Sequence, residues 1–411
     1  MSIRKREWTT AKGEKRQAWY YDYRDQNGKR RAKQFRTKGE AVAYETQARG
    51  EIKTGVHVAD STSKTLQEAG ELWLGNAEAN GREASTLRQY RQHLKYHIAP
   101  LIGSTKLSRL TTPVVEEFRD RLVEKCSRPL ARAVLTSLKG ILKNAKRIGL
   151  VSYNAAGDTA IEISKRHRKK VVMPTKDEIR AMLQKSGELW PITRIEITRK
   201  RTQKVVAVSW RPLLVTAIFS GLRCSELRGL SWDNVDFDEK VIRVRQRADF
   251  LNKMGVPKSE AGNREVPMSP MVINTLKEWK LACPTTPLKL VFPHETGGIH
   301  SNSNLHAHYW GPLQRELGII SGTVTVKDKA GKPKLDKEGR PIMRSKPKYT
   351  FHALRHFAAS LFIEQKMSPK KVQEIMGHSS IQVTYDIYGH LFASPEDDAK
   401  AMAQIEARLL G

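Results

Sequence analysis

The stretch that begins at His352 carries polar side chains that a helical core does not require, and their spacing restricts the fold around them. His352 and Arg355 stand three positions apart, about one helical turn, so both side chains leave the same face of a predicted helix. Gly377 and His378 follow where the helical pattern breaks, as is typical of a helix C-terminus. Tyr388 comes ten residues later. We expect a mainly helical domain that presents these groups together.

A second arginine, Arg223, lies far upstream, directly after the hydrophobic run 213–219. Two arginines, two histidines and a tyrosine suit a phosphodiester substrate. A tyrosine oxygen can attack phosphorus and hold the product as a covalent ester. Guanidinium groups match the non-bridging oxygens and stay charged at any working pH, while histidines donate hydrogen bonds or move protons. This chemistry needs no metal and no cofactor.

The order of these groups resembles a known family. His352-x-x-Arg355, Gly377-His378 and Tyr388, preceded by the sequence GLRCSEL around Arg223, are similar to the signature of tyrosine recombinases, the phage-integrase family. The resemblance covers most of the chain, and four boxes in this order form a specific signal.

The resemblance implies a role for each residue of the set. Arg223 and Arg355 would grip the scissile phosphate, His352 and His378 would be the box histidines, and Tyr388 would be the nucleophile. The family also has a hairpin lysine that protonates the leaving 5′-oxygen, and the segment VPKSE, ahead of REVPM, points to Lys258 for that role. Glu226, within the first box, is interpreted as a supporting residue.

Each residue taken alone has a simpler interpretation. Arg223 would be a solvated helix residue, Lys258 an ordinary hairpin lysine, and His352 a core histidine with satisfied hydrogen bonds. Tyr385 lies three residues before Tyr388 and competes with it as a candidate tyrosine. The order and spacing of the complete set favour the catalytic interpretation.

The charge of the chain indicates a polyanionic partner. Lysine and arginine outnumber acidic residues 73 to 43, which gives a net charge of +30. DNA is the expected partner, and a membrane surface is the weaker alternative. Three widely spaced cysteines indicate neither a disulfide framework nor a cysteine-based zinc site. The N-terminus is charged and no run of 18 apolar residues occurs, so we expect a cytoplasmic protein that is neither secreted nor membrane-spanning.

The predicted fold class is multidomain, and residues 1–60 form its first domain. Residues 16–36 alternate like a hairpin around Asn27-Gly28, and Thr37-x-x-Glu40 predicts the start of a helix that runs to about Ile52. This part resembles the arm-type DNA-binding domain of integrases, a three-stranded sheet with one helix. A solvated, charged hairpin is the alternative.

Residues 63–160 are predicted to form an all-helical second domain. Thr65-x-x-Glu68 caps a first helix, Ser85-Thr86 precedes a second that Pro100 and Gly103 end, and 112–125 and 128–148 form two more. Arg88, Arg91 and Lys95 face away from the apolar stripe of the second helix. The domain resembles the core-binding domain of the family, although periodicity alone also allows a generic helical bundle.

Residues 172–411 are predicted to form the catalytic domain, mainly helical with one small sheet. A basic run, 165–170, would lie along DNA as a linker, and Pro174-Thr175-x-x-Glu178 opens the first helix. An inserted hairpin at 194–208 has no assigned role, 241–245 forms a strand, and the turn 253–258 carries Lys258.

Three further features of this domain leave alternatives open. The basic insertion 321–348 is a DNA-touching hairpin, a contact between protomers or a tolerated surface loop. His306-x-His308 and His352-x-x-x-His356 have ligand-like spacing, but no carboxylate or cysteine completes a metal site in sequence. The tail helix 399–410 packs either on its own domain or on a neighbouring protomer.

The resemblance predicts a site-specific recombinase that integrates and excises a phage or mobile element through a 3′-phosphotyrosine ester. Its partners would be double-stranded DNA attachment sites and further copies of itself in a synaptic homotetramer, with an excisionase and a host DNA-bending protein as candidate accessory partners. Two rivals stay open: a topoisomerase that uses the same ester without exchanging strands, and a non-enzymatic DNA-binding regulator.

Overall fold

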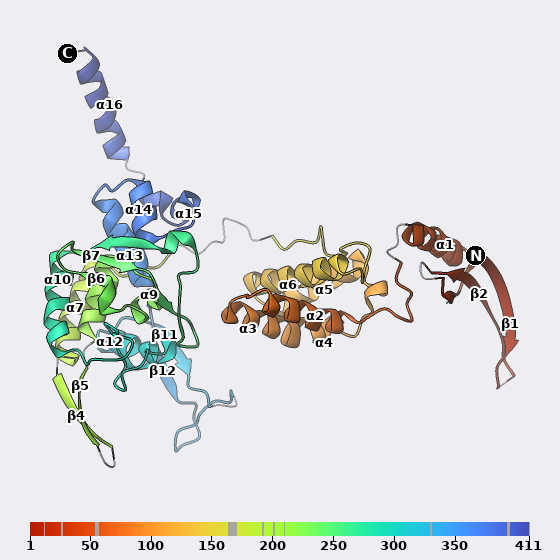
Figure 1. The fold of residues 1–411 in the computed structure, drawn as a ribbon, viewed down its shortest axis with the longest axis horizontal. Coiled ribbons are helices and arrows are strands. Elements are labelled where there is room, and N and C mark those ends of the chain that lie inside the picture. The colour runs from red at the N-terminus through yellow and green to blue at the C-terminus, as the bar shows by residue number, and fades with distance from the viewer. Residues whose placement is uncertain are drawn as a thin grey trace. The chain divides into compact units, whose positions relative to one another are not determined.

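The computed structural model describes residues 1–11, 13–25, 28–53, 57–162, 171–190, 193–199, 202–208, 210–328, 331–392 and 395–410. Contacts divide the chain into two compact units, Met1–Arg168 and Lys169–Gly411 (Figure 1). The predicted three-domain boundaries stay a prediction. The predicted linker 165–170 and Asn27 of the predicted turn lie outside the described residues.

The first unit opens with a three-stranded antiparallel sheet. Strands β1 (Ser2–Thr9), β2 (Lys15–Arg24) and β3 (Arg30–Phe35) pair in the order β1-β2-β3, and helix α1 (Lys38–Lys53) follows. The pairing of β2 with β3 confirms the predicted hairpin. The Thr37 hydroxyl accepts from the Glu40 amide at 3.2 Å and the Glu40 carboxylate accepts from the Thr37 amide at 3.3 Å, so the predicted capping box begins α1.

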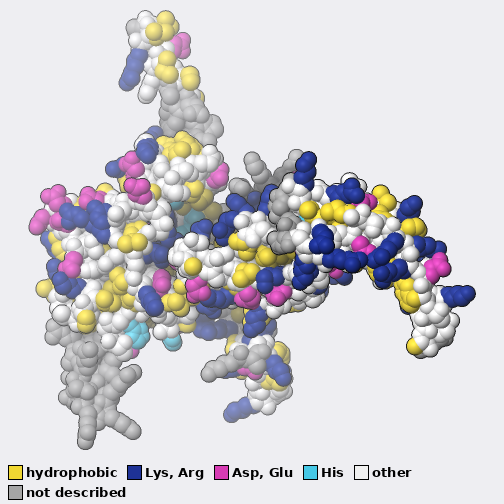
Figure 2. Space-filling view, turned by 45° about the vertical axis from the view of Figure 1, so that its right-hand side comes forward, with side chains coloured by type: hydrophobic (Ala, Val, Ile, Leu, Met, Phe, Trp, Pro, Cys, Tyr) yellow, Lys and Arg dark blue, Asp and Glu magenta, His cyan; other side chains and the backbone are white. Residues whose placement is uncertain are grey.

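The rest of this unit is helical and has its own core. Its elements are α2 (Leu66–Ala79), α3 (Ala84–His93), the π-turn η1 (Leu94–Ile98), α4 (Ala99–Ile102), η2 (Leu107–Arg109), α5 (Thr112–Lys125) and α6 (Arg128–Arg147). Apolar side chains from α2, α5 and α6 pack together, with Leu66, Phe118 and Leu138 fully buried. Arg88, Arg91 and Lys95 are exposed, as predicted. Figure 2 shows Lys and Arg side chains gathered on the visible face of this unit.

The predicted start of the second helix is wrong, and its predicted end is right at Gly103 but wrong at Pro100. The helix already begins at Ala84, after Glu83, so Ser85 and Thr86 lie inside its first turn and do not precede it. Pro100 does not end it either. The five residues before α4 form a π-turn, in which each backbone hydrogen bond spans five residues and not four. Pro100 therefore falls in the first turn of α4, where the missing amide hydrogen costs little.

The second unit begins with α7 (Lys176–Leu189), which starts at the predicted Thr175–Glu178 capping box. It continues with the hairpin β4 (Thr193–Arg199) and β5 (Thr202–Val208), then α8 (Arg211–Ser220), α9 (Cys224–Arg228), α10 (Pro270–Ala282), α11 (Asn302–Asn304), η6 (Leu305–Trp310), α12 (Gly311–Glu316), α13 (Ala353–Glu364), α14 (Pro369–Met376), α15 (Ile381–Phe392) and α16 (Pro395–Leu410). The prediction of a mainly helical domain is confirmed.

The predicted small sheet is present and has three strands, but two-stranded sheets accompany it. Strand β7 (Val241–Val244) lies between β10 (Arg264–Pro267) and β6 (Val235–Asp236) in the order β10-β7-β6. Between β7 and β10 the chain forms a second ribbon from β8 (Arg247–Ala248) and β9 (Met254–Gly255). The predicted insertion is a hairpin of β11 (Ile320–Thr325) and β12 (Met343–Pro347).

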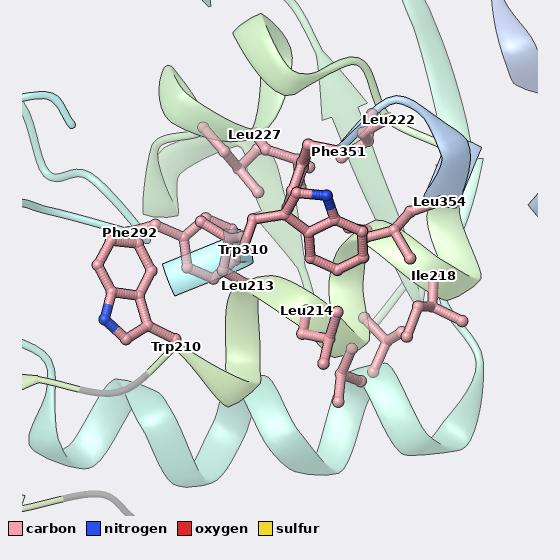
Figure 3. Close-up of a cluster of buried hydrophobic side chains, with 14 of the residues drawn as sticks. Trp210, Leu213, Leu214, Ile218, Leu222, Leu227, Phe292, Trp310, Phe351 and Leu354 are labelled. Carbon is pink, nitrogen blue, oxygen red and sulfur yellow. The ribbon is translucent and has the colours of Figure 1, made fainter. Parts of the chain in front are cut away.

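The core of the second unit holds the two candidate arginines in place. Figure 3 shows Leu214 and Ile218 of α8 beside Trp310, Phe351 and Leu354. Leu222 belongs to the same cluster. Burying each such side chain contributes about 1.5–3 kcal/mol, so the backbone at these positions is firmly fixed. Leu222 directly precedes Arg223 and Leu354 directly precedes Arg355, and the core therefore anchors both segments at the site.

Candidate active site

Arg223 is positioned by two tight backbone features. Gly221, with φ of 61°, ends α8 in the left-handed conformation, and Arg223 stands at the N-cap of α9 two residues later. The Arg223 amide donates to the Glu226 carboxylate at 2.9 Å and its Nη1 donates to the same carboxylate at 2.7 Å. Its Nη2 donates to the Gly377 carbonyl oxygen at 2.6 Å. The first arginine thus reaches the segment that carries His378.

Glu226 is shared by two arginines. The buried Arg264 on β10 donates from Nη2 and Nη1 to the two carboxylate oxygens at 2.9 and 3.2 Å, and from Nε to the Ile375 carbonyl oxygen at 2.6 Å. Burial alone would raise the pKa of Glu226, but the bonds and charges of Arg264 and Arg223 lower it to about 2. The carboxylate is therefore ionised and braces Arg223.

Arg355 lies on α13 and is almost completely buried, with 4% of its surface exposed. Its Nη1 donates to the Gly221 carbonyl oxygen at 2.6 Å and its Nη2 donates to that of Met376. Burial and then the charge of Arg223 lower the pKa of Arg355. A guanidinium nevertheless keeps its proton at any working pH, so this group is a cation in a poorly hydrated setting.

These four residues leave an excess of positive charge. Arg355 interacts electrostatically with the guanidinium groups of Arg223 and Arg264 and with the Glu226 carboxylate. The three guanidinium groups repel one another, and the single carboxylate neutralises only part of their charge. A bound anion would relieve the remaining repulsion. The arrangement therefore fits a phosphate group.

Four rings form a row beside this charge. The His352 and His356 centroids are 4.8 Å apart, those of His356 and Tyr388 are 5.7 Å apart, and those of Tyr388 and His378 are 6.2 Å apart with nearly parallel planes. The Tyr388 hydroxyl and His356 Nδ1 are hydrogen-bonded at 2.7 Å. His378 Nδ1 bonds to the Thr384 hydroxyl at 2.9 Å.

The pKa values of this row follow from its surroundings. Burial, followed by the charge of Arg355, lowers the pKa of His378 to about 4. The His352 residue is exposed overall, but desolvation of its ring, followed by the charges of His356 and the arginines, lowers its pKa to about 4 as well. Burial outweighs the Arg355 charge and raises the pKa of Tyr388 to about 12. At neutral pH the histidines are uncharged and the phenol keeps its proton.

The helix ends explain how the later residues arrive at the site. Gly377 ends α14 with φ of 64°, as predicted, and the His378 amide then bonds back to the Gln373 carbonyl oxygen at 3.1 Å. Tyr388 is buried on the inner face of α15, whereas its rival Tyr385 is 47% exposed and packs on Phe392. The structure thus separates the two tyrosines by the face they occupy.

The structure brings together five of the six predicted site residues: Arg223, His352, Arg355, His378 and Tyr388. The sixth, Lys258, is exposed on the loop after β9, and its role stays a prediction. His356 was not predicted as a catalytic residue, because its spacing from His352 was interpreted only as that of a metal ligand. Its place four residues after His352, on the same helix face, was the available signal.

Two family matches cover most of the chain. Residues 175–394, more than half of the 411 residues, match the phage integrase family, and residues 65–123 match the N-terminal SAM-like domain of phage integrases. A tyrosine recombinase XerC-like protein of Caldanaerobacter subterraneus subsp. tengcongensis is 26% identical over 396 residues, which cover 92% of this chain and 92% of that protein.

Solved structures share the fold. The Tn1549 transposon integrase in complex with a circular intermediate DNA superposes with a TM-score of 0.62 at 20% identity, over 84% of this chain and all of the other. A lambda integrase tetramer bound to a Holliday junction superposes with a TM-score of 0.51 at 19% identity, over 91% of this chain and 95% of the other.

Proposed function

The chain belongs to the phage integrase family and is a site-specific DNA recombinase, and we propose that Tyr388 is the nucleophile with which it breaks and rejoins DNA. The observation that carries this proposal is the excess positive charge of Arg223, Arg264 and Arg355 over Glu226, directly beside a buried phenol. A phosphodiester supplies the anion that this charge lacks, and it brings phosphorus to the tyrosine oxygen.

Each candidate site residue has one role in the proposed cleavage step. Arg223 and Arg355 hold the non-bridging oxygens, where negative charge grows as the Tyr388 oxygen attacks phosphorus. The bond from phosphorus to the 5′-oxygen breaks, and Lys258 gives that oxygen a proton. His352 donates a hydrogen bond to the phosphate, and His378, stacked on the Tyr388 ring, assists proton transfer there. The product is a 3′-phosphotyrosine ester and a free 5′-hydroxyl.

Strand exchange follows from the reverse of this step. The 5′-hydroxyl of a partner duplex attacks the ester, Tyr388 leaves as the phenol, and two such rounds through a four-way junction exchange the strands. We propose that four copies act together at double-stranded attachment sites, which the lambda integrase tetramer supports by analogy. The element moved is a phage or another mobile element, and an excisionase and a host bending protein are proposed as accessory partners.

The proposed cellular site is the bacterial cytoplasm, where DNA is accessible. Among the helices that the structure describes, none has both the length and the apolar character needed to cross a bilayer. The basic hairpin β11–β12 is proposed to touch DNA or a neighbouring protomer, since its strands are largely exposed.

A nicked suicide substrate tests the nucleophile. The wild-type chain is expected to form an adduct that survives denaturation, and Tyr388→Phe is expected to form none. Tyr385→Phe is the matched control, because Tyr385 lies on the same helix with 47% of its surface exposed. The assignment fails if Tyr388→Phe still forms the adduct or if only Tyr385→Phe loses it.

A further inference from the structure

The Tyr388 hydroxyl is bonded to a histidine that has no role in the step proposed above. His356 Nδ1 lies 2.7 Å from the Tyr388 oxygen, which is the length of a strong hydrogen bond. The two residues are 32 positions apart, on α13 and α15, so folding alone brings them together. The atom that must lose a proton before or during attack on phosphorus therefore already faces an imidazole nitrogen.

The position of His356 keeps its ring neutral. It follows Arg355 directly and lies one turn from His352, and its side chain is partly buried. Burial and then the charge of Arg355 lower the pKa of His356. A neutral imidazole with its proton on Nε2 presents Nδ1 as an acceptor, which suits a phenol that still carries its own proton.

His378 is placed differently with respect to the same tyrosine. Its Nδ1 is occupied by the Thr384 hydroxyl at 2.9 Å, and its ring lies nearly parallel to the Tyr388 ring at 6.2 Å between centroids. Such stacking fixes the plane of the phenol. The contact with the hydroxyl is made by His356.

We propose that His356 is a catalytic residue of the recombinase, the base that accepts the Tyr388 proton, and that His378 assists this transfer by orienting the ring. The inference rests on the proposed role of Tyr388. As the tyrosine oxygen bonds to phosphorus, its O–H bond breaks and the proton passes to His356 Nδ1, which becomes imidazolium. Meanwhile the bond from phosphorus to the 5′-oxygen breaks and that oxygen takes its own proton from Lys258. On rejoining, the attacking 5′-hydroxyl gives its proton back to Lys258, and the imidazolium returns its proton to the departing phenol oxygen.

The two partners differ widely in basicity, and this sets the timing. The pKa of Tyr388 is raised to about 12 while that of His356 is lowered. Transfer before attack would be strongly uphill, so the proton moves as the phosphorus–oxygen bond forms and the phenol oxygen becomes acidic. The incoming phosphate also places negative charge near the new imidazolium.

His356→Asn tests the proposal, because the amide oxygen accepts a hydrogen bond near the position of Nδ1 but takes up no proton at neutral pH. Single-turnover adduct formation by the full chain is measured on the nicked suicide substrate and on a second substrate with sulfur as the bridging 5′-atom. Sulfur leaves without a proton, so it bypasses the acid and leaves the base necessary. We expect His356→Asn to be slower by about 100-fold or more on both substrates.

Three controls separate the possible failures. His390→Asn, an exposed histidine on α15, should cleave like wild type. DNA binding and the melting temperature should be unchanged in His356→Asn. If its melting temperature falls, the cleavage rates of His356→Gln on the two substrates are compared with wild type instead. A rate within about threefold of wild type, or recovery on the sulfur substrate alone, overturns the role of His356 as base. An adduct with Tyr388→Phe instead overturns the proposed nucleophile.

Discussion

Arg355 donates from Nη1 to the carbonyl oxygen of Gly221 at 2.6 Å, and this bond joins segments 134 residues apart. Gly221 ends the helix that precedes Arg223, and Arg223 in turn donates to the carbonyl oxygen of Gly377. Each arginine is therefore tied to a turn next to another member of the site. The geometry of the proposed phosphate grip depends on both ties.

Arg355→Lys should lose one of these ties. A lysine offers one compact ammonium group, whereas the guanidinium donates to Gly221 and Met376 from two nitrogens held in a fixed plane. Removing such a fixed donor typically slows a reaction by about 100-fold or more. Single-turnover cleavage should fall by that order while the DNA remains bound, and a rate close to wild type would contradict the assignment.

Gly377→Ala should destabilise the second unit. A Cβ at this position would lie 2.8 Å from Arg264 Nη1 and 2.9 Å from the Ala261 carbonyl oxygen, and φ of 64° is unfavourable for alanine. The left-handed conformation alone costs about 1–2 kcal/mol. Calorimetry should show the melting temperature of this unit lowered by roughly 4 °C or more.

Gly389→Ala provides the matched control for that experiment. Gly389 lies inside α15, and an added Cβ would meet only Tyr385 atoms at 3.8 Å and beyond. Alanine favours a helix by up to about 1 kcal/mol over glycine, so the control should melt at the same temperature or slightly higher. If both variants lowered the melting temperature equally, the clash at Gly377 would not be the cause of the destabilisation.

Glu226→Gln should weaken the fold and the site together. The carboxylate side chain is 3% exposed and neutralises part of the charge of Arg223 and Arg264. Removing one partner of a buried ion pair typically costs about 3–5 kcal/mol. Glu265→Gln is the control, since that side chain is 52% exposed and its pairs with Arg243 and Arg245 are worth little. Thermal unfolding of both variants compares the two costs directly.

Acidification from about pH 6.5 to pH 4 should destabilise the second unit through His378. Its pKa is about 4 in the folded chain against about 6.5 unfolded, so in this window the unfolded chain binds the extra proton. The stabilisation is complete above pH 6.5 and its loss reaches at most about 3 kcal/mol. Glu226, with a folded pKa of about 2, keeps its contribution throughout this range.

The melting temperature of the second unit, measured at several values of pH, checks that expectation. His378→Asn should make the dependence shallower, whereas His390→Asn should leave it as in wild type. A melting temperature that is constant between pH 7 and pH 4 would show that the histidine is protonated equally in both states.

Lys258→Met should be slow on ordinary DNA and fast on a substrate with a bridging 5′-sulfur. Loss of a general acid typically costs about 100- to 10,000-fold, and a thiolate leaving group removes the need for the proton. Lys253→Met, an exposed lysine in the same hairpin, controls for the lost charge. If sulfur gives no recovery, Lys258 does not act as the acid in cleavage.

Local sequence patterns predicted many elements of the fold because their causes are local. The Thr65–Glu68 and Thr175–Glu178 capping boxes begin helices where the sequence places them, and Gly377 ends one. The predicted helix end at Pro100 was wrong. A π-turn in the five residues before Ala99 accommodates the proline, and the helical run continues. The π-turn depends on packing, and no spacing of residues in the sequence predicts it.

The residues that gather at the candidate site were predictable from their order in the chain, but their contacts were not. Arg223, Arg355 and Tyr388 were identified because they stand in a specific order along the chain. The bond between His356 and the Tyr388 hydroxyl was not foreseen, because it joins two helices whose register is decided by burial around Tyr388. The buried Arg264 that braces Glu226 comes from a strand, 38 residues away, for the same reason.

The bonds from Arg223 and Arg355 to Gly221, Met376 and Gly377 all end on main-chain oxygens. Such an acceptor persists whatever side chain occupies the position, provided that the backbone keeps its path. Libraries that seek new attachment-site preferences can therefore randomise side chains whose replacement keeps this backbone path. Withholding the two left-handed glycines from diversification should keep most library members competent for cleavage.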